Sequence, residues 1–365
     1  RHFSEKELEI RFAQLKKQIV PADETIREQA EKHWGRVAKP LGSLGVLEED
    51  IVRAAAAQGG KVPDFSKRAL LIFCADNGVV EEGVSQTGQE VTAAVVSNMT
   101  RGRSCSCLMA EKAETDVFPI DIGIACEVEH QGKLHPLTER KIRRGTSNFT
   151  KEAAMTRQEV LTAVLTGIDA VRVLKDREYR LFTVGEMGIG NTTTSSAVAS
   201  VLLRKEPELV TGCGAGLDLA GLKRKTKAIR RGIDLHQPDP MDGMDVLQKV
   251  GGFDLAAMAG AFLGGAIYHV PVVIDGVIAA AAAAAAGRIA PAATDYMLAA
   301  HVSAEPASIW LLDLIGVTPA IRAGLRLGEG TGALALFPLL DMALSIYRDM
   351  DTFAEMEIEE YKPLV

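Results

Sequence analysis

The stretch GEMGIGNTTTSSA, residues 185–197, joins an apolar run to an Ala-rich one and combines closely spaced glycines, one carboxylate and a series of hydroxyls. Gly188 and Gly190 allow the backbone to come close to a ligand, and Asn191 or Thr192 caps the helix predicted to follow. A helix start with free N–H groups binds anions, so this stretch predicts a phosphate site. A purely structural tight turn is the alternative that the segment alone leaves open.

The glycine spacing in this stretch differs from two common phosphate-binding motifs. It matches neither G-x-G-x-x-G, the dinucleotide fingerprint, nor the P-loop pattern G-x-x-x-x-G-K-[ST]. A nicotinamide-dependent oxidoreductase is therefore disfavoured, because no acid follows about twenty residues beyond a proper fingerprint.

Short apolar runs that end in glycine turns recur along the chain and alternate with helical segments. This alternation is typical of an α/β fold in which crossover helices join parallel strands. The predicted strands cover residues 68–75, 116–123, 179–185, 270–275, 296–302 and 324–330. Ligands of such sheets lie beyond the carboxyl ends of the strands, so the turns after the strands are the expected place for chemistry.

The composition favours small-molecule chemistry. The 365 residues are 47% hydrophobic and carry a formal net charge of −7 with interspersed signs, which argues against binding to nucleic acid. The five cysteines form no C-x-x-C pair and are expected to be reduced. The first residues lack the apolar core of a signal peptide, and Asp275 interrupts the Ala-rich run of residues 272–287. We therefore expect no membrane segment and a cytoplasmic location.

Two further glycine turns carry candidate chemistry. TGCGAGLD, residues 211–218, precedes a basic helix from which Lys225 can reach a phosphate. LGEGTGA, residues 327–333, places Glu329 between two glycines and behind apolar residues. A carboxylate desolvated there has a raised pKa, which suits it to accept a proton. At the end of the first predicted strand, Asp76 either takes part in function or only fixes the loop.

These turns, in this order, resemble those of the nicotinate-nucleotide:dimethylbenzimidazole phosphoribosyltransferase family, whose members make the α-ribotide of the lower ligand of cobalamin-type cofactors. GEMGIGNTTT and LGEGTGA carry the resemblance most specifically, and it spans nearly the whole chain. Further matching segments are KPLGSLGVLEE (39–49), DIGI (121–124), RRGTSNFT (143–150), GGFDLAAMAGA (251–261) and HVSAEPA (301–307). The resemblance implies a Rossmann-like parallel sheet flanked by helices, small-molecule substrates and a homodimer.

The resemblance also implies a smaller helical domain built from both chain ends. The sequence agrees with this expectation, since residues 5–57 have a charged, helical pattern. We expect the small domain to comprise residues 1–60 and 337–365, and a large α/β phosphoribosyltransferase domain to comprise residues 61–336.

By similarity, Glu329 is the general base and Glu186 is a second active-site carboxylate whose role stays open. The resemblance assigns the binding of the nucleotide phosphate and ribose to Gly188, Asn191, Gly214, Gly216, Lys225 and Ser303. The residues expected in the base pocket are Thr87, Val91, Val95 and Leu327.

The implied reaction transfers the phosphoribosyl group of nicotinate mononucleotide to a lower-ligand base such as 5,6-dimethylbenzimidazole, giving an α-ribotide and nicotinate. The leaving pyridinium nitrogen is already cationic, so we expect neither a metal nor a cofactor. The paired acids of diphosphate-using phosphoribosyltransferases are missing, since VVIDGV offers only Asp275. Removal of the proton on the other ring nitrogen of the base is assigned to Glu329.

Several residues depart from the family pattern. Asn77 replaces the histidine of D-H-G, Ala215 replaces a threonine, and Thr87 and Val95 stand where a serine and a glutamine are usual. We therefore expect a less polar base pocket, which leaves the acceptor open. One alternative is a phenol or p-cresol phosphoribosyltransferase that works as a subunit of a heterodimer with a paralogous chain. The other is a nucleotide-binding partner subunit without activity of its own.

Overall fold

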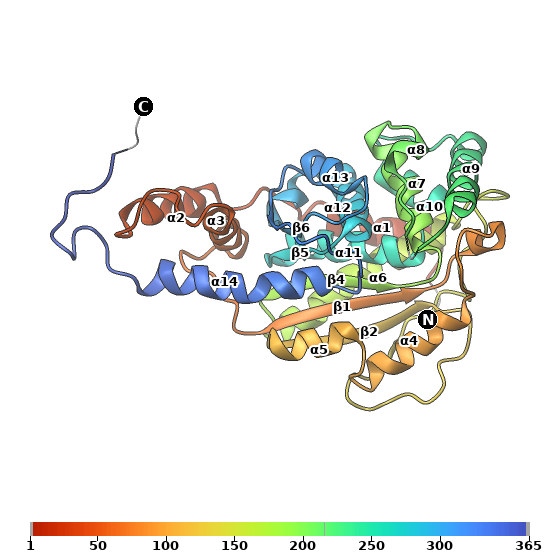
Figure 1. Ribbon diagram of the computed structural model, residues 1–365, viewed down its shortest axis with the longest axis horizontal. Coiled ribbons are helices and arrows are strands. Elements are labelled where there is room, and N and C mark those ends of the chain that lie inside the picture. The colour runs from red at the N-terminus through yellow and green to blue at the C-terminus, as the bar shows by residue number, and fades with distance from the viewer. Residues whose placement is uncertain (1–2, 215, 363–365) are drawn as a thin grey trace.

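One parallel sheet of seven strands organises the chain in the computed structural model, which describes residues 3–214 and 216–362 (Figure 1). The strand order is β3-β2-β1-β4-β5-β6-β7, and every pairing is parallel. The predicted α/β class with a parallel sheet is confirmed. The direction in which strands are added reverses between β1 and β4, and open sheets of this kind bind ligands beside such a reversal.

Five of the predicted strands are observed, with bounds that differ by at most two residues, whereas the two edge strands β3 and β7 were not predicted. They are β1 (Arg68–Ala75), β2 (Thr115–Gly123), β3 (Thr138–Glu139), β4 (Leu181–Met187), β5 (Val272–Ile274), β6 (Met297–His301) and β7 (Pro319–Ile321). The strand predicted for residues 324–330 is wrong, because that segment is a loop that follows β7. The backbone φ is positive at Gly324, Gly328, Glu329 and Gly330, and a β-strand does not contain such residues.

Helices cover both faces of the sheet. They are α1 (Glu5–Lys16), α2 (Glu24–Arg36), α3 (Val46–Gln58), α4 (Glu90–Thr100), α5 (Cys105–Lys112), α6 (Arg157–Asp176), α7 (Asn191–Leu203), α8 (Pro207–Val210), α9 (Leu219–His236), α10 (Gly243–Val250), α11 (Phe253–Tyr268), α12 (Val277–Ile289), α13 (Ser308–Ile315) and α14 (Thr331–Asp349), with 3-10 helices at Gly78–Glu82 and Pro291–Tyr296. Helices α11 and α12 pack on one face, whereas α4, α5 and α14 pack on the other (Figure 1).

The central strand β1 is buried over its whole length, and its side chains alternate between two hydrophobic cores. Leu71 and Phe73 pack into the core formed with α6 and α11. Leu70 and Ile72 point to the other face and pack into the core formed with α3, α5 and α14. This burial on both faces explains why the strand is a continuous apolar run.

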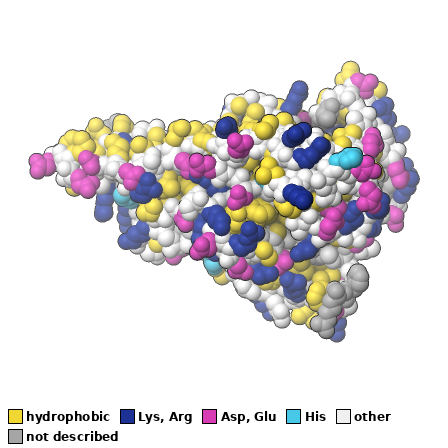
Figure 2. Space-filling model, turned by 90° about the horizontal axis from the view of Figure 1, so that it is seen from below, with side chains coloured by type: hydrophobic (Ala, Val, Ile, Leu, Met, Phe, Trp, Pro, Cys, Tyr) yellow, Lys and Arg dark blue, Asp and Glu magenta, His cyan; other side chains and the backbone are white. Residues whose placement is uncertain are grey.

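Segments from the two chain ends pack together. Helices α2 and α3 lie beside the C-terminal half of α14, and the molecule tapers toward this end (Figures 1 and 2). The rings of Trp34 and Tyr347 meet edge to face at 5.0 Å, and Val37 and Thr352 form an antiparallel bridge. Helix α1 lies elsewhere, against α6. The division into domains of residues 1–60 with 337–365 and of residues 61–336 stays a prediction.

The Ala-rich run forms helix α12, which is buried between α7, α11 and α13. Close packing against these helices accounts for its many small side chains. Within residues 3–214 and 216–362, no helix has both the length and the apolar character that crossing a bilayer requires.

Candidate active site

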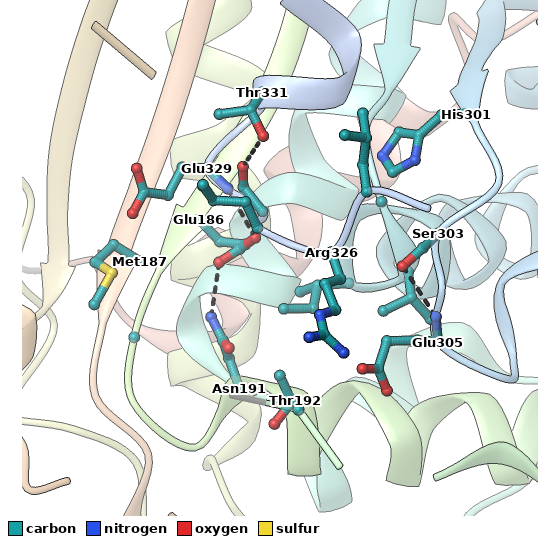
Figure 3. A pocket seen from close by; sticks show the side chains of 18 of the residues that line it. Glu186, Met187, Asn191, Thr192, His301, Ser303, Glu305, Arg326, Glu329 and Thr331 are labelled. Carbon is teal, nitrogen blue, oxygen red and sulfur yellow. Dashed lines mark hydrogen bonds between the residues drawn. The ribbon is translucent and has the colours of Figure 1, made fainter. Parts of the chain in front are cut away.

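A cavity of about 250 Å³ opens beyond the carboxyl ends of β4, β5 and β6, beside the reversal of strand order (Figure 3). The turn after β4 and the start of α7 form one wall. The turn after β5, the loop after β6 and the loop that leads into α14 form the rest. Parallel strands direct these turns to one edge of the sheet, which is how residues from 186 to 331 come together.

Glu186, at the end of β4, is the central carboxylate of the cavity. Its side chain is only 7% exposed. The side-chain amide of Asn191 donates to Glu186 Oε2 at 3.0 Å, and the backbone N–H of Glu329 donates to Oε1 at 3.3 Å. Burial raises the pKa of Glu186 well above its ordinary value, and the negative charges of Asp275, Asp254 and Glu329 raise it further. These hydrogen bonds hold the Glu186 side chain in place, and the burial disfavours its ionised form.

Asp254, at the start of α11, extends this network. The same Asn191 amide donates to Asp254 Oδ2 at 3.2 Å, so one side chain joins two buried carboxyl groups. Burial raises the pKa of Asp254 to about 7. A proton is therefore readily kept within this network near neutral pH.

Glu329 lies in the loop before α14, between Gly328 and Gly330. It is half-buried, and its backbone adopts a left-handed φ of 58°. In Figure 3 its carboxylate points toward the side on which Met187 lies, away from Ser303 and Arg326. Burial raises the pKa of Glu329, whereas the hydroxyl of Ser106, which donates to Oε2 at 3.4 Å, acts in the opposite direction. Such a carboxylate is suited to take up a proton.

Asp275, at the end of β5, fixes the turn that carries Glu329. Its Oδ2 accepts from the N–H of Gly330 and its Oδ1 from the N–H of Ala333, both at 3.1 Å. The Nε2 atom of buried His301 lies 3.7 Å from Asp275 Oδ1. The carboxylate thus caps the positive end of α14 from a neighbouring strand.

The start of α7 is different, because no side chain in the described part of the protein caps it. Gly190 precedes the helix with a φ of 93°, and Asn191 and Thr192 line the cavity. Gly188 is required for packing, since a Cβ atom there would lie 1.9 Å from the carbonyl oxygen of Ala75. An uncapped helix start that faces a cavity attracts an anion.

Lys225, on α9, reaches the same wall from outside the cavity lining. Its side chain is fully buried, and its Nζ donates to Thr192 Oγ1 at 3.0 Å and to the carbonyl of Gly212 at 3.1 Å. Burial lowers the pKa of Lys225 to about 8. Gly214 lines the cavity beside these atoms.

Gly216 lies outside the cavity lining, and its carbonyl accepts a hydrogen bond from the side chain of Gln86. This bond ties the loop after α8 to the loop before α4. The substitution noted at Ala215 falls outside the described residues.

Ser303 lies on the opposite wall, in the loop after β6. Its hydroxyl oxygen accepts from the N–H of Glu305 at 3.3 Å, which leaves the hydroxyl hydrogen available to a ligand. Arg326 also lines this wall and is exposed, so it adds a positive charge at the cavity mouth.

The residues predicted for the base pocket are only partly brought together. Leu327 lines the cavity. Thr87 is exposed in the segment before α4, and Val91 and Val95 are half-buried on α4, outside the cavity lining. The hydroxyl of Thr92 accepts from the N–H of Ile189 at 3.1 Å, so α4 stays close to the turn after β4.

Asp76 is a loop-fixing residue. It is fully buried, and it accepts from the hydroxyl of Thr92 at 2.6 Å and from the N–H of Ala125 at 2.8 Å. These bonds account for both carboxylate oxygens.

Sequence reasoning did not assign Asp254, Asp275 or Arg326 to the site. The position of Asp275 directly after a strand was the available signal for it. Asp254 lies at a helix start, and nothing in its local sequence indicates a contact with Asn191, 63 residues away.

Comparisons with known proteins agree with this geometry. A model of the phosphoribosyltransferase family matches residues 19–358. A nicotinate-nucleotide:dimethylbenzimidazole phosphoribosyltransferase of Clostridium acetobutylicum is 43% identical over 350 residues, which cover 96% of this chain and 98% of the relative. A protein of the same name from Escherichia coli K12 is 39% identical over 348 residues, which cover 95% of this chain and 96% of the relative.

A solved structure is similar over the same length. The crystal structure of CobT from Thermus thermophilus matches with a TM-score of 0.86 at 37% identity, and the match covers 92% of this chain and 100% of that one. Sequence, fold and site thus lead to one conclusion. The chain belongs to the nicotinate-nucleotide:dimethylbenzimidazole phosphoribosyltransferase family.

Proposed function

We propose that the chain transfers the phosphoribosyl group of nicotinate mononucleotide to 5,6-dimethylbenzimidazole, giving an α-ribotide and nicotinate. The observation that carries the proposal is the placement of Glu186 and Glu329 in one cavity with the uncapped start of α7. Carboxylates and an anion site are the groups that this reaction requires. The names of the relatives support the choice of donor and acceptor.

The phosphate of the donor binds at the start of α7. The dipole of the helix attracts the anion, and Gly214 lines the cavity beside the helix start. Lys225 supports the site through Thr192, and its positive charge offsets the phosphate charge. The hydroxyl of Ser303 donates from the opposite wall, so the phosphoribosyl group lies across the cavity.

The acceptor base binds on the side to which Glu329 points, beside Met187 and α4. A ring nitrogen of the base forms the new bond to the anomeric carbon. The bond to nicotinate breaks, and its electron pair neutralises the pyridinium nitrogen. Glu329 takes the proton from the other ring nitrogen, so the product base is neutral. Glu186 faces the ribose, held by Asn191 and by the backbone of Glu329.

Neither of the two alternative functions, a phenol-using subunit or an inactive nucleotide-binding subunit, gains support. The named relatives are dimethylbenzimidazole enzymes rather than phenol-using subunits, and both candidate carboxylates are present. Incubation of the purified chain with nicotinate mononucleotide and a panel of benzimidazoles, purines and phenols tests the proposal. We expect the fastest turnover with 5,6-dimethylbenzimidazole. Turnover with phenols alone, or activity only after a second subunit is added, would overturn it.

We also infer a homodimer, which rests on the family resemblance. Light scattering of the purified chain should then give twice the chain mass. A value equal to one chain at micromolar concentration would contradict the inference.

A further inference from the structure

A second cavity, of about 380 Å³, lies at the far end of α14 from Glu329. We call it the basic cavity; it is lined by Gln29, Lys32, His33 and Arg36 of α2, Lys61 and Val62 after α3, and Tyr347 and Arg348 of α14. Helix α14 has 19 residues, and a rise of about 1.5 Å per residue places its two ends roughly 27 Å apart. The basic cavity is therefore separate from the candidate active site.

The lining of the basic cavity carries one sign of charge. Among the described residues, it contains two lysines, two arginines and one histidine, and no carboxylate. The chain as a whole has a net charge of −7, so this is a local reversal of sign. In Figure 2, Lys and Arg side chains lie beside Asp and Glu side chains on the tapered end of the molecule, which α2, α3 and the end of α14 form. Cations that share a concave surface repel one another and attract anions.

Nearby carboxylates neutralise only part of this charge. Lys32 Nζ lies 3.9 Å from Glu28, and both side chains are largely exposed. Arg348 forms two hydrogen bonds with Asp349, of 2.8 and 2.7 Å. Glu355 also lies near His33, whose charge contributes to lowering the pKa of Glu355, although the hydrogen bonds from Thr352 lower it more.

The other two cations remain available. Among residues 3–214 and 216–362, no carboxylate lies within 4 Å of the side-chain nitrogens of Arg36 or Lys61. Arg36 comes from the last turn of α2, whereas Lys61 comes from the segment after α3. Two chain segments thus present unpaired positive groups to one cavity.

Hydrogen bonds hold the floor of the basic cavity together. Tyr347 is 2% exposed, and its hydroxyl donates to the carbonyl of Lys61 at 2.8 Å. Its own carbonyl lies 2.6 Å from His33 Nε2, so α14 is tied both to α2 and to the segment after α3. The Oε1 atom of Gln29 is buried and has no hydrogen-bond partner in the described part of the chain.

We propose that the basic cavity binds a small molecule that carries phosphate. The planar guanidinium of Arg36 suits two-point binding of a phosphate, and the ammonium of Lys61 adds a point charge. The volume falls within the range of about 300–1,000 Å³ that is typical of small-molecule sites. The lysine and arginine side chains of the lining favour an anionic ligand over an apolar one.

Calorimetric titration with inorganic pyrophosphate at low salt tests the proposal. All proteins carry Lys225→Met, which removes a proposed phosphate-supporting group of the active site. The cavity variant adds Arg36→Gln and Lys61→Gln. The control adds Lys16→Gln and Lys17→Gln, which are exposed on or next to α1 and change the net charge equally. We expect at least a tenfold loss of affinity in the cavity variant and less than a twofold loss in the control.

Equal weakening in both variants would show a general charge effect and would overturn the proposal, as would unchanged binding in the cavity variant. If the double substitution unfolds the protein, Lys61→Gln alone serves, because only the backbone of Lys61 holds Tyr347. A several-fold loss of affinity is then expected, and no loss would contradict the site. The titration needs no turnover, so its outcome is independent of the proposed transferase activity.

Discussion

Glu186 and Glu329 are the same residue type held in two different environments. Glu186 is almost fully buried and accepts hydrogen bonds at both oxygens. Glu329 is half-buried and, among the residues that the structure describes, accepts a side-chain hydrogen bond only from the hydroxyl of Ser106. The remaining acceptor positions of Glu329 are free for a substrate proton. This difference is the physical reason to assign proton removal to Glu329 rather than to Glu186.

The substitution Glu329→Gln should lower kcat by about 10²- to 10⁴-fold, the usual contribution of a positioned base. Nicotinate mononucleotide should still bind, because the proposed phosphate contacts lie at α7. Steady-state kinetics and a binding titration with the nucleotide separate the two effects. Glu111→Gln, on the exposed surface of α5, is a matched control that should leave kcat unchanged. Wild-type turnover in Glu329→Gln would place the base elsewhere.

The raised pKa of Glu329 also sets an expected pH dependence. The carboxylate accepts a proton only when ionised, so activity is present above its pKa and is lost as the pH falls through it. Because burial raises this pKa above 4.5, the loss begins at a higher pH than an ordinary glutamate would give. A pH profile of kcat in the wild type measures it. A profile that stays flat down to pH 4.5 would contradict the assignment.

Asp254→Asn should change how stability depends on pH. The folded-state pKa of Asp254 is about 7, above the ordinary 3.8, so the neutral form is favoured in the folded protein. This contribution to the free energy of unfolding is complete below pH 3.8 and is lost as the pH rises through 7. Each unit by which folding raises the pKa corresponds to about 1.4 kcal/mol. Asparagine mimics the neutral acid and should flatten this decline.

Urea unfolding between pH 4 and 8 is the measurement. Asp313→Asn, on an exposed position of α13, is the control and should leave the slope unchanged. If Asp254→Asn and the wild type lose stability in parallel as the pH rises, Asp254 does not hold a proton in the folded state.

At the level of elements, α7 and α14 begin in similar ways but are completed differently. Both follow a glycine with positive φ, and neither has a side-chain cap from its own N-cap residue. Asp275 occupies the start of α14, whereas the start of α7 faces the cavity. A carboxylate of the protein therefore caps the start of α14, whereas the start of α7 is accessible to an anion in the cavity.

Asp275→Asn should both destabilise the protein and slow turnover. An amide offers one acceptor oxygen in place of two, so the N–H of Gly330 or of Ala333 loses its partner, at a cost of about 1–3 kcal/mol. The turn that carries Glu329 then loosens. Asp242→Asn is the matched control, because Asp242 also accepts from two backbone N–H groups at a helix start, but in an exposed position.

Thermal unfolding and kcat check this expectation. The control should change neither, since asparagine is a good cap where water can satisfy the remaining groups. If Asp275→Asn keeps wild-type stability, the carboxylate does not fix the turn.

The strands show how far the sequence predicts this fold. β1 was predicted with its observed bounds, because a strand buried on both faces has an unbroken apolar pattern. The segment 324–330 has apolar residues at alternate positions as well, but its glycines serve a left-handed turn that brings Glu329 to Glu186. The local sequence pattern does not distinguish a strand from a loop whose glycines adopt a left-handed conformation.

The candidate site shows a similar division. Glu329 and Glu186 stand in glycine turns and could be chosen from sequence and family resemblance. Asp254 and Asp275 act on partners 63 and 55 residues away, so only the folded chain shows their contacts. Lys225 was assigned to the phosphate site, yet its full burial against Thr192 follows from the packing of α9 on α7.

At the scale of the whole molecule, Tyr347 joins the two chain ends. Its ring packs against Trp34 and His33, and its hydroxyl binds the carbonyl of Lys61. Tyr347→Ala should lower the free energy of unfolding by about 3–5 kcal/mol, as for other buried aromatic residues. Tyr347→Phe removes only the hydrogen bond and should cost about 0.5–1.5 kcal/mol. Chemical unfolding measures both values, and equal losses would mean that the ring contributes nothing.

The pairing of the chain ends also sets an order of events during synthesis. Trp34 leaves the ribosome long before Tyr347, with roughly 313 residues (347 − 34) between them. At about 5–20 residues per second, α2 and α3 wait on the order of 16–60 s for the helix that covers them. Until α14 has emerged, their apolar surfaces are open to chaperones. Helix α14 therefore completes this end of the molecule only after the whole sheet has been made.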